Sequence, residues 1–277
     1  DYGALFASIR HKGQSIGEVV ALNIGDRSKK LFLIFSYLTL VLVVGAFASI
    51  VAGTFNGFMT DASGALVHNH VNGSTATISL LFIVLAVIFG LLVYRFEMPL
   101  GRATLLGVAG IVGVIALGLR FPLYAGYDTW MWLLGLYILV ASVTPVWILL
   151  QPRDYLSSFL LYAMMLAAVV GIVAAHPVIE LPAFTSFEVN GQYLFPALFV
   201  TVACGAISGF HSLVASGTTS KQLSSERDAR LVGFGSMLIE SALGIASLIA
   251  VGYIFTQNGH AFTSQTPTQV LADGLSQ

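Results

Sequence analysis

The segment Leu31-Phe-Leu-Ile-Phe-Ser-Tyr-Leu-Thr-Leu-Val-Leu-Val-Val-Gly-Ala-Phe-Ala-Ser-Ile-Val-Ala-Gly-Thr54 contains no charged side chain along its whole length. A helix rises about 1.5 Å per residue, so about 20 apolar residues cross the hydrocarbon core of a bilayer. Because no water reaches that core, a lone spanning segment satisfies its backbone N–H and C=O groups only as a helix. This segment therefore predicts a membrane-spanning helix.

Six further windows have the same apolar character, and together they decide the fold class. They are residues 75–94, 103–119, 130–150, 155–175, 194–214 and 231–255. The whole chain is 57% hydrophobic and 9% charged, whereas a soluble domain carries about 25% charged residues. A soluble bundle of such helices would lack a polar exterior. We predict an all-α fold, a polytopic transmembrane bundle of seven helices over residues 31–255.

The basic residues fall on alternate loops, which predicts the orientation of the bundle. Cytoplasmic loops of membrane proteins are enriched in Lys and Arg. One side of the predicted bundle carries eleven of the twelve basic residues, namely Arg10, Lys12, Arg27, Lys29, Lys30, Arg95, Arg102, Arg153, Lys221, Arg227 and Arg230. The other side carries Arg120 alone. Residues 1–30 are thus predicted to be a cytoplasmic segment, and residues 256–277 an exported polar tail.

Three smaller features complete the predicted architecture. Residues 9–23 are predicted to form a short cytoplasmic helix, and the Thr/Gln-rich tail is predicted to be partly disordered. Pro145 lies inside the window 130–150, where a proline removes a backbone hydrogen bond and predicts a kink or hinge. Arg153 and Asp154 are adjacent and are interpreted as an ion pair at the membrane interface.

Missing patterns exclude several classes of membrane enzyme. One cysteine, Cys204, cannot supply a disulfide or a multi-cysteine metal site. Only His211 lies in a predicted span, so the spans cannot supply both ligands of a haem that is held by two histidines. The spans contain no lysine for a retinal Schiff base, and the chain has no Walker loop or His-Glu-x-x-His sequence. His68 and His70, in an exported loop, are weak evidence for a metal.

These exclusions leave two functional classes open. From the missing patterns we predict no cofactor, no metal and no enzymatic activity. The net charge of −1 provides no basic face, so we also predict no nucleic-acid partner. A secondary transporter and a non-catalytic scaffold subunit of a membrane complex both remain. A transporter requires a polar centre along a path through the bilayer, and the chain contains two candidate regions for it.

Glu240 is the only acidic residue deep inside a predicted span, ten residues after Arg230. Ten residues rise about 15 Å, which places the carboxyl group near the middle of a core about 30 Å thick. Ionisable groups at that depth are costly and face the bundle interior or a wet cavity. Glu240 is interpreted as a proton or ion carrier or a substrate contact. The alternative is a protonated carboxyl group bonded to a neighbouring helix.

The run Cys204-Gly-Ala-Ile-Ser-Gly-Phe-His-Ser-Leu-Val-Ala-Ser-Gly-Thr-Thr-Ser-Lys221 crowds glycine and hydroxyl residues into one end of window 194–214. Glycine weakens a helix by about 1 kcal/mol relative to alanine, and Ser or Thr can satisfy freed backbone groups. Transporters use interrupted helices of this kind to expose backbone to substrate or ion. Tight packing of small residues against another helix is the alternative.

Four stretches resemble the carbon starvation protein A family. They are 141–156 (ASVTPVWILLQPRDYL), 194–219 (LFPALFVTVACGAISGFHSLVASGTT), 233–241 (GFGSMLIES) and 1–18 (DYGALFASIRHKGQSIGE). The resemblance implies a bacterial or archaeal inner-membrane transporter, linked to nutrient limitation, that takes up peptides or pyruvate with protons. Family members are longer, so it also implies that further helices of the same protein precede Asp1 and act as partners of this bundle.

The resemblance and the two polar regions together yield a site prediction. Window 194–214 is expected to break near Gly205 and Gly209, which act as hinges together with Pro145. Glu240 with His211 is expected to carry the coupling ion, since histidine changes its charge near neutral pH. The residues predicted to bind substrate are Ser208, His211, Ser212, Ser216, Thr218 and Thr219. The choice between pyruvate and peptide, and between proton and sodium, stays open.

Overall fold

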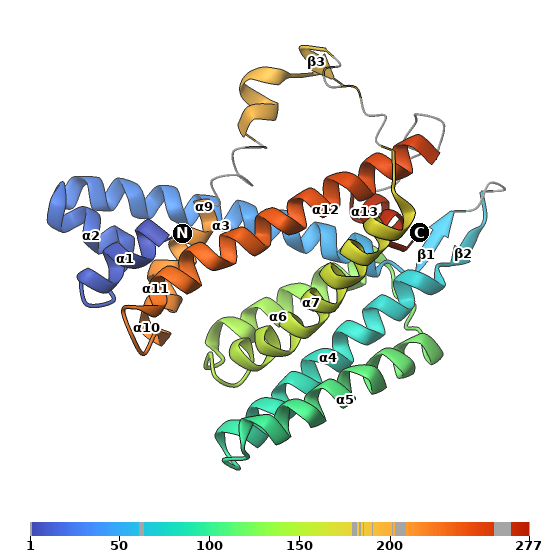
Figure 1. The fold of residues 1–277 in the computed structure, drawn as a ribbon, viewed down its shortest axis with the longest axis horizontal. Helices are drawn as coiled ribbons and strands as arrows, with labels where there is room; N and C mark the ends of the chain where they lie inside the picture. Colours follow the sequence, from blue (N-terminus) through green and yellow to red (C-terminus); the bar gives the residue numbers. More distant parts are fainter. Residues whose placement is uncertain are drawn as a thin grey trace. The chain divides into compact units, whose positions relative to one another are not determined.

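The computed structural model describes residues 2–60, 64–178, 182, 184, 186–189, 191–200, 202, 209–257 and 267–276 (Figure 1). The chain divides into two compact units, and each is described by itself. Unit 1 comprises Asp1–Ser36 with Met165–Gln277, and unit 2 comprises Tyr37–Met164. Two long helices, α3 (Asp26–Phe55) and α7 (Leu150–Ala175), contribute to both units.

Unit 2 is a helical bundle with one short hairpin. Its elements besides parts of α3 and α7 are β1 (Phe58–Thr60), β2 (Leu66–His68), α4 (His70–Tyr94), α5 (Leu100–Arg120) and α6 (Tyr127–Val143). β1 and β2 pair antiparallel, with Met59 opposite Val67. α4 and α5 pack along each other (Figure 1), and buried Phe89 and Leu156 belong to the core there. A Cβ atom on Gly107 would lie 2.7 Å from the Leu156 side chain.

Unit 1 contains the N-terminal helices and the polar run of the sequence. Its elements besides parts of α3 and α7 are α1 (Tyr2–Arg10), α2 (Ile16–Asn23), β3 (Glu188–Val189), β4 (Gln192–Tyr193), η1 (Leu194–Leu198), α9 (Gly209–Val214), η2 (Ala215–Thr219), α10 (Ser220–Gln222), α11 (Asp228–Arg230), η3 (Leu231–Gly235), α12 (Ser236–Gln257) and α13 (Pro267–Ser276). The η elements are π-helical turns. α1 packs against η2 and η3, around a small core of Leu5, Ala215 and Ala229.

The described residues contain five helices that are long and apolar enough to cross a membrane. They are Asp26–Phe55, His70–Tyr94, Leu100–Arg120, Leu150–Ala174 and Asp228–Thr256. The predicted fold class, an all-α transmembrane bundle, is confirmed. One of the seven predicted spans is shorter than expected, since α6 is an apolar helix of 17 residues. Window 194–214 is described only in part, through η1, residues 199, 200 and 202, and α9.

Pro145 ends a helix instead of kinking one, which corrects the prediction for window 130–150. α6 stops at Val143, and Thr144 has an extended backbone with ψ of 133°. The residue before a proline is sterically excluded from the helical region, so the helix cannot continue through this position. The chain turns, with the Ile148 N–H bonded to the Pro145 carbonyl at 3.0 Å, and α7 begins at Leu150.

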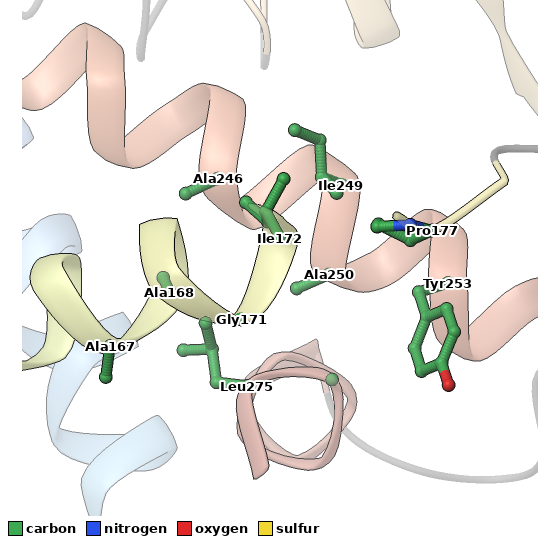
Figure 2. Close-up of a pocket in the computed structure, with 11 residues that line it drawn as sticks. Ala167, Ala168, Gly171, Ile172, Pro177, Ala246, Ile249, Ala250, Tyr253 and Leu275 are labelled. Carbon is green, nitrogen blue, oxygen red and sulfur yellow. The ribbon is translucent and has the colours of Figure 1, made fainter. Parts of the chain in front are cut away.

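The described residues near the two ends of the chain form helices that the prediction did not include. The single predicted helix over 9–23 is replaced by α1 and α2, which are separated by a turn with Gly13 at a φ of 73°. The tail contains α13, which packs against α12. A Cβ atom on Gly274 would lie 2.6 Å from the Ala250 carbonyl oxygen, so only glycine allows this approach. Figure 2 shows the small apolar pocket that these helices form with the end of α7.

Replacing Gly233 with alanine is expected to loosen α1 from η3, because the new methyl group would lie 2.9 Å from the Tyr2 Cα. Overpacking of this kind costs about 1–3 kcal/mol, and each kcal/mol lowers the unfolding midpoint by about 2–4 °C. Thermal unfolding in detergent measures the change. Gly235→Ala is the matched control, since its methyl group would meet the Leu231 side chain at 3.6 Å. Equal midpoints for the two variants would contradict this packing.

Candidate functional site

The structure brings His211 and Glu240, two residues of the predicted site, together in unit 1. His211 lies on α9 and Glu240 on α12, and 3.6 Å separates His211 Nδ1 from Glu240 Oε2. The two side chains form an ion pair when the imidazole is protonated. The distance between the two atoms is slightly longer than that of a direct hydrogen bond. Each side chain is 46% exposed in the isolated chain. A proton shared between an imidazole and a carboxylate needs only a small closing movement of this pair.

A cavity of about 110 Å³ lies next to the pair. Its lining residues come from α1, α9, η2, η3 and α12, and they are Leu5, His211, Val214, Ala215, Thr219, Val232, Gly233 and Ser236. Ser236 lies one helical turn before Glu240, so both side chains are on the same face of this helix. The cavity therefore combines one titratable group and two hydroxyl groups with apolar walls.

The predicted hydroxyl residues divide between the cavity and the surrounding structure. Thr219 lines the cavity. Ser216 is 1% exposed, and its hydroxyl accepts the Ile16 N–H at 3.3 Å and lies 2.9 Å from the Ser212 carbonyl. The Thr218 hydroxyl donates to the Val214 carbonyl at 3.0 Å. The structure brings Thr219 to the cavity with His211, whereas Ser216 holds the N-terminal segment in place.

Several residues of the predicted site lie outside the described residues, and others lie away from the cavity. Cys204, Gly205 and Ser208 are outside them, so a break of the helix near 205 stays a prediction. Gly209 is the first residue of α9. Among the described residues no group of three His, Cys, Asp or Glu side chains is placed to hold a metal ion. The His68 ring packs against Tyr124, with ring centroids 4.3 Å apart and the ring planes tilted by 45°.

The sequence analysis did not identify α1 as part of this site. Ser8 is fully buried, and its hydroxyl donates to the Gln14 carbonyl at 2.6 Å and lies 2.9 Å from the Ser220 hydroxyl. Arg10 Nε contacts Glu226 Oε1 at 2.9 Å, although this pair is exposed. A cluster of small residues at 229–236 was the available signal that another backbone approaches there, but it does not identify the partner.

The π-helical turns η2 and η3 also escaped the sequence analysis. They flank the loop around Leu223, and both contribute lining residues to the cavity. A π-helical turn carries one residue more than an α-helical turn, which shifts the following side chains around the axis, and such turns are frequent at functional sites. A hydropathy average does not distinguish π-helical turns from α-helical ones, because the residues of both are similarly apolar.

A second, larger cavity lies in unit 2. It measures about 440 Å³ and is walled mainly by apolar side chains of α3, α4, α6 and α7. Arg153 lines it and contacts Asp154 Oδ1 at 3.1 Å, which agrees with the predicted ion pair. Its guanidinium also donates to the Tyr137 hydroxyl at 3.4 Å. A fixed positive charge at the edge of an apolar cavity was not predicted from the sequence.

Several relatives of the chain are named as transporters. The chain is 32% identical to the peptide transporter CstA of Mycobacterium tuberculosis over 99% of its own length, and 35% identical to the peptide transporter CstA of Escherichia coli over 98%. It is 33% identical to the pyruvate/proton symporter BtsT of Escherichia coli over 96%. No solved structure matches the chain.

The extent of these matches decides what they show. The chain spans 38% of the length of both CstA relatives and 37% of that of BtsT. It matches the family described as carbon starvation protein CstA over residues 1–276, which is nearly its whole length. The chain therefore belongs to the carbon starvation protein CstA family.

Proposed function

We propose that this chain supplies the ion-coupling centre of a secondary active transporter, a symporter that takes up peptides or small carboxylates such as pyruvate. The observation that carries the proposal is the His211–Glu240 pair, 3.6 Å apart beside a cavity. Two relatives are named peptide transporters and one a pyruvate/proton symporter. The latter name favours a proton over sodium as the coupling ion. Transport of this kind needs no cofactor and no enzymatic step.

The exposure of the pair supports a coupling role. Each side chain is 46% exposed in this chain, and a charged group facing lipid is costly. The relatives are more than twice as long as the part that this chain matches. We infer that further helices of the same protein cover the exposed side of the pair, or that this side faces a water-filled path between them. A titratable pair open to such a path can load and release a proton.

The cavity supports a site for the anionic end of a substrate. His211 in its protonated form and the Thr219 hydroxyl present donors to the same space. The Ser236 hydroxyl also lines it, as an acceptor, because it donates to the Val232 carbonyl. We propose Ser212 and Thr218, in the neighbouring turns, as further substrate contacts, together with Ser208, which lies outside the described residues. Movement at Gly205, Gly209 and Pro145 would let the site face each side of the membrane in turn. We place the protein in the inner membrane of its cell, with residues 1–30 cytoplasmic.

Glu240→Gln is expected to abolish gradient-driven accumulation, because glutamine keeps the shape of the side chain and cannot release a proton. In proteoliposomes of the native-length protein, accumulation under an imposed pH gradient should fall at least about tenfold. Exchange of substrate without a gradient should persist. Glu97→Gln, a carboxylate after α4, is the control. Full accumulation by the Glu240 variant would remove the coupling role.

His211→Gln is expected to reduce accumulation as well, and the two substitutions should not add. Residues that act as one unit give double variants no worse than the more severe single variant. The measurement is the same gradient-driven uptake in the two single variants and the double variant. Multiplied losses in the double variant would show that His211 and Glu240 act separately.

The proposed orientation predicts which side of the membrane each loop faces. In a background where Cys204 is serine, the Asp128→Cys variant should react in intact cells with a maleimide that cannot cross membranes. The Lys12→Cys variant should react only after the membrane is permeabilised. Both side chains are exposed in the structure, so access to the reagent decides the result. The reverse labelling pattern would invert the assignment.

A further inference from the structure

Helix α1 forms one wall of the cavity beside the titratable pair. Leu5 lines that cavity, and its side chain is only 1% exposed. The other buried members of its cluster are small, namely Ala215 of η2 and Ala229 of α11, and the partly buried Ile9 and Leu223 pack against them. A single large side chain of the N-terminal helix therefore fills the space between the segment after α9 and the segment before α12.

The contacts of α1 lie on the loop side of the pair. Gly233 packs against α1 and precedes Glu240 by seven residues, which is about 10 Å of helix rise. Ser216, whose carbonyl oxygen lies 3.4 Å from the Ser8 hydroxyl, follows His211 by five residues. Helix α1 thus lies between the pair and the loop that joins α10 to α11, which is cytoplasmic in the proposed orientation. A path from the pair to that side of the membrane passes α1.

Hydroxyl groups hold α1 in this place. Ser8 is fully buried, and its hydroxyl donates to the Gln14 carbonyl at 2.6 Å and lies 2.9 Å from the Ser220 hydroxyl. The Ser216 hydroxyl accepts the Ile16 N–H at 3.3 Å. When α1 lifts, water on the loop side replaces these bonds, so their net contribution to holding the helix is modest. The contact is specific in its geometry and weak enough to open.

A turn with two left-handed residues separates α1 from α2. Lys12 has a φ of 58° and Gly13 a φ of 73°. Beyond this turn, α2 has an anchor of its own on the start of α3, where Glu18 Oε1 contacts Lys29 Nζ at 2.6 Å. Hinges are a few loop residues that absorb a large change of φ and ψ, and glycine does so at little steric cost. The turn therefore allows α1 to swing while α2 stays on α3.

The surface under α1 belongs to the segments that position the pair. Helix α1 packs on the π-helical turns η2 and η3 and on α10 and α11 beside them (Figure 1). η2 follows the helix that carries His211, and η3 precedes the helix that carries Glu240. A π-helical turn shifts the side chains around it and is frequent at functional sites. A movement of α1 therefore acts on both sides of the titratable pair.

We propose that α1 is a gate between the His211–Glu240 pair and the loop side of the membrane, with Leu5 as its plug and Ser8 as its latch. The seated helix closes this path, and a swing about the turn at Lys12 opens it. A symporter requires such a gate, because a pair open to both sides at once lets protons leak. This inference rests on the proposed transport function and adds a moving element that is separate from the hinges proposed above.

The test locks α1 with a disulfide in the native-length protein. Ser8→Cys and Ser220→Cys are introduced into a background without other cysteines, which includes Cys204→Ser. The two serine hydroxyl oxygens are 2.9 Å apart, so a sulfur–sulfur bond of about 2.05 Å needs little movement. Exchange of labelled pyruvate and of a labelled tripeptide across proteoliposomes, without any gradient, is measured before and after oxidation.

Oxidation should stop α1 from opening. Because the locked protein does not populate the open state, exchange of the transported probe should fall at least about tenfold, and reduction should restore it. Equilibrium binding of the same probe in detergent should stay within about twofold, since the site remains accessible from the opposite side. A merely structural role of α1 predicts no such separation of exchange from binding.

Met59→Cys with Val67→Cys is the matched control, because these residues are direct partners across the β1–β2 hairpin and such partners lie within disulfide distance. Its oxidation should leave exchange unchanged. Equal exchange by the fully oxidised and the reduced Ser8/Ser220 variant would show that α1 is a fixed wall and would overturn the gate. Loss of binding together with exchange, or an equal loss in the control, would overturn it as well.

A second variant pair covers a failure to fold. Should the Ser8/Ser220 variant aggregate in size-exclusion chromatography, Arg10→Cys with Glu226→Cys decides, bridged by a reducible bifunctional thiol reagent. These side chains are 61% and 48% exposed, and surface substitutions affect folding little. Full accumulation by Glu240→Gln with blocked exchange in the locked variant would refute the coupling proposal and leave the gate standing. Absence of exchange in the unmodified protein would refute the transport function itself.

Discussion

Hydrogen bonding inside a medium without water is the constraint on which this structure depends. Most hydroxyl groups on the long helices satisfy it locally, by donating to the carbonyl one turn earlier. Thr75, Thr104 and Ser247 do so at 2.7–2.8 Å. Polar groups whose partners lie outside their own helix are therefore the informative ones. They include the Ser8 network, the His211–Glu240 pair and the Arg153 guanidinium beside the larger cavity. The buried Ser36 hydroxyl has no acceptor among the described residues, and nothing in the structure explains it.

Hydropathy predicted the helices well and their ends poorly, for a physical reason. The stretch from Leu31 lies within α3, which begins five residues earlier because Asp26 sits favourably at a helix N-terminus. The residues 144–149 are almost as apolar as α6, so composition alone extends that helix through them. The steric effect of Pro145 on Thr144 decides instead that the helix ends. Window averages measure transfer into lipid, and they contain no information on backbone geometry.

The sequence predicted those site residues that are ionisable, because ionisable residues are rare in the apolar windows. Glu240 and His211 stand out because few ionisable groups occur in the apolar windows, and each such group is costly there. The contact of α1 with η2 and η3 depends on residues more than 200 positions apart, such as Ser8 and Ser216. A glycine at position 233 is consistent with a close approach of another backbone, but only the structure shows that this backbone is that of Tyr2. The larger cavity is equally invisible, since four separate helices create it.

The ionisable groups of the two units differ in chemistry. A guanidinium stays protonated throughout the physiological range, whereas an imidazole is a side chain that can change its charge there. Unit 1 holds the His211–Glu240 pair, and unit 2 holds Arg153, oriented by Asp154. Of these groups, only the pair in unit 1 therefore has the chemistry that the proposed proton coupling requires.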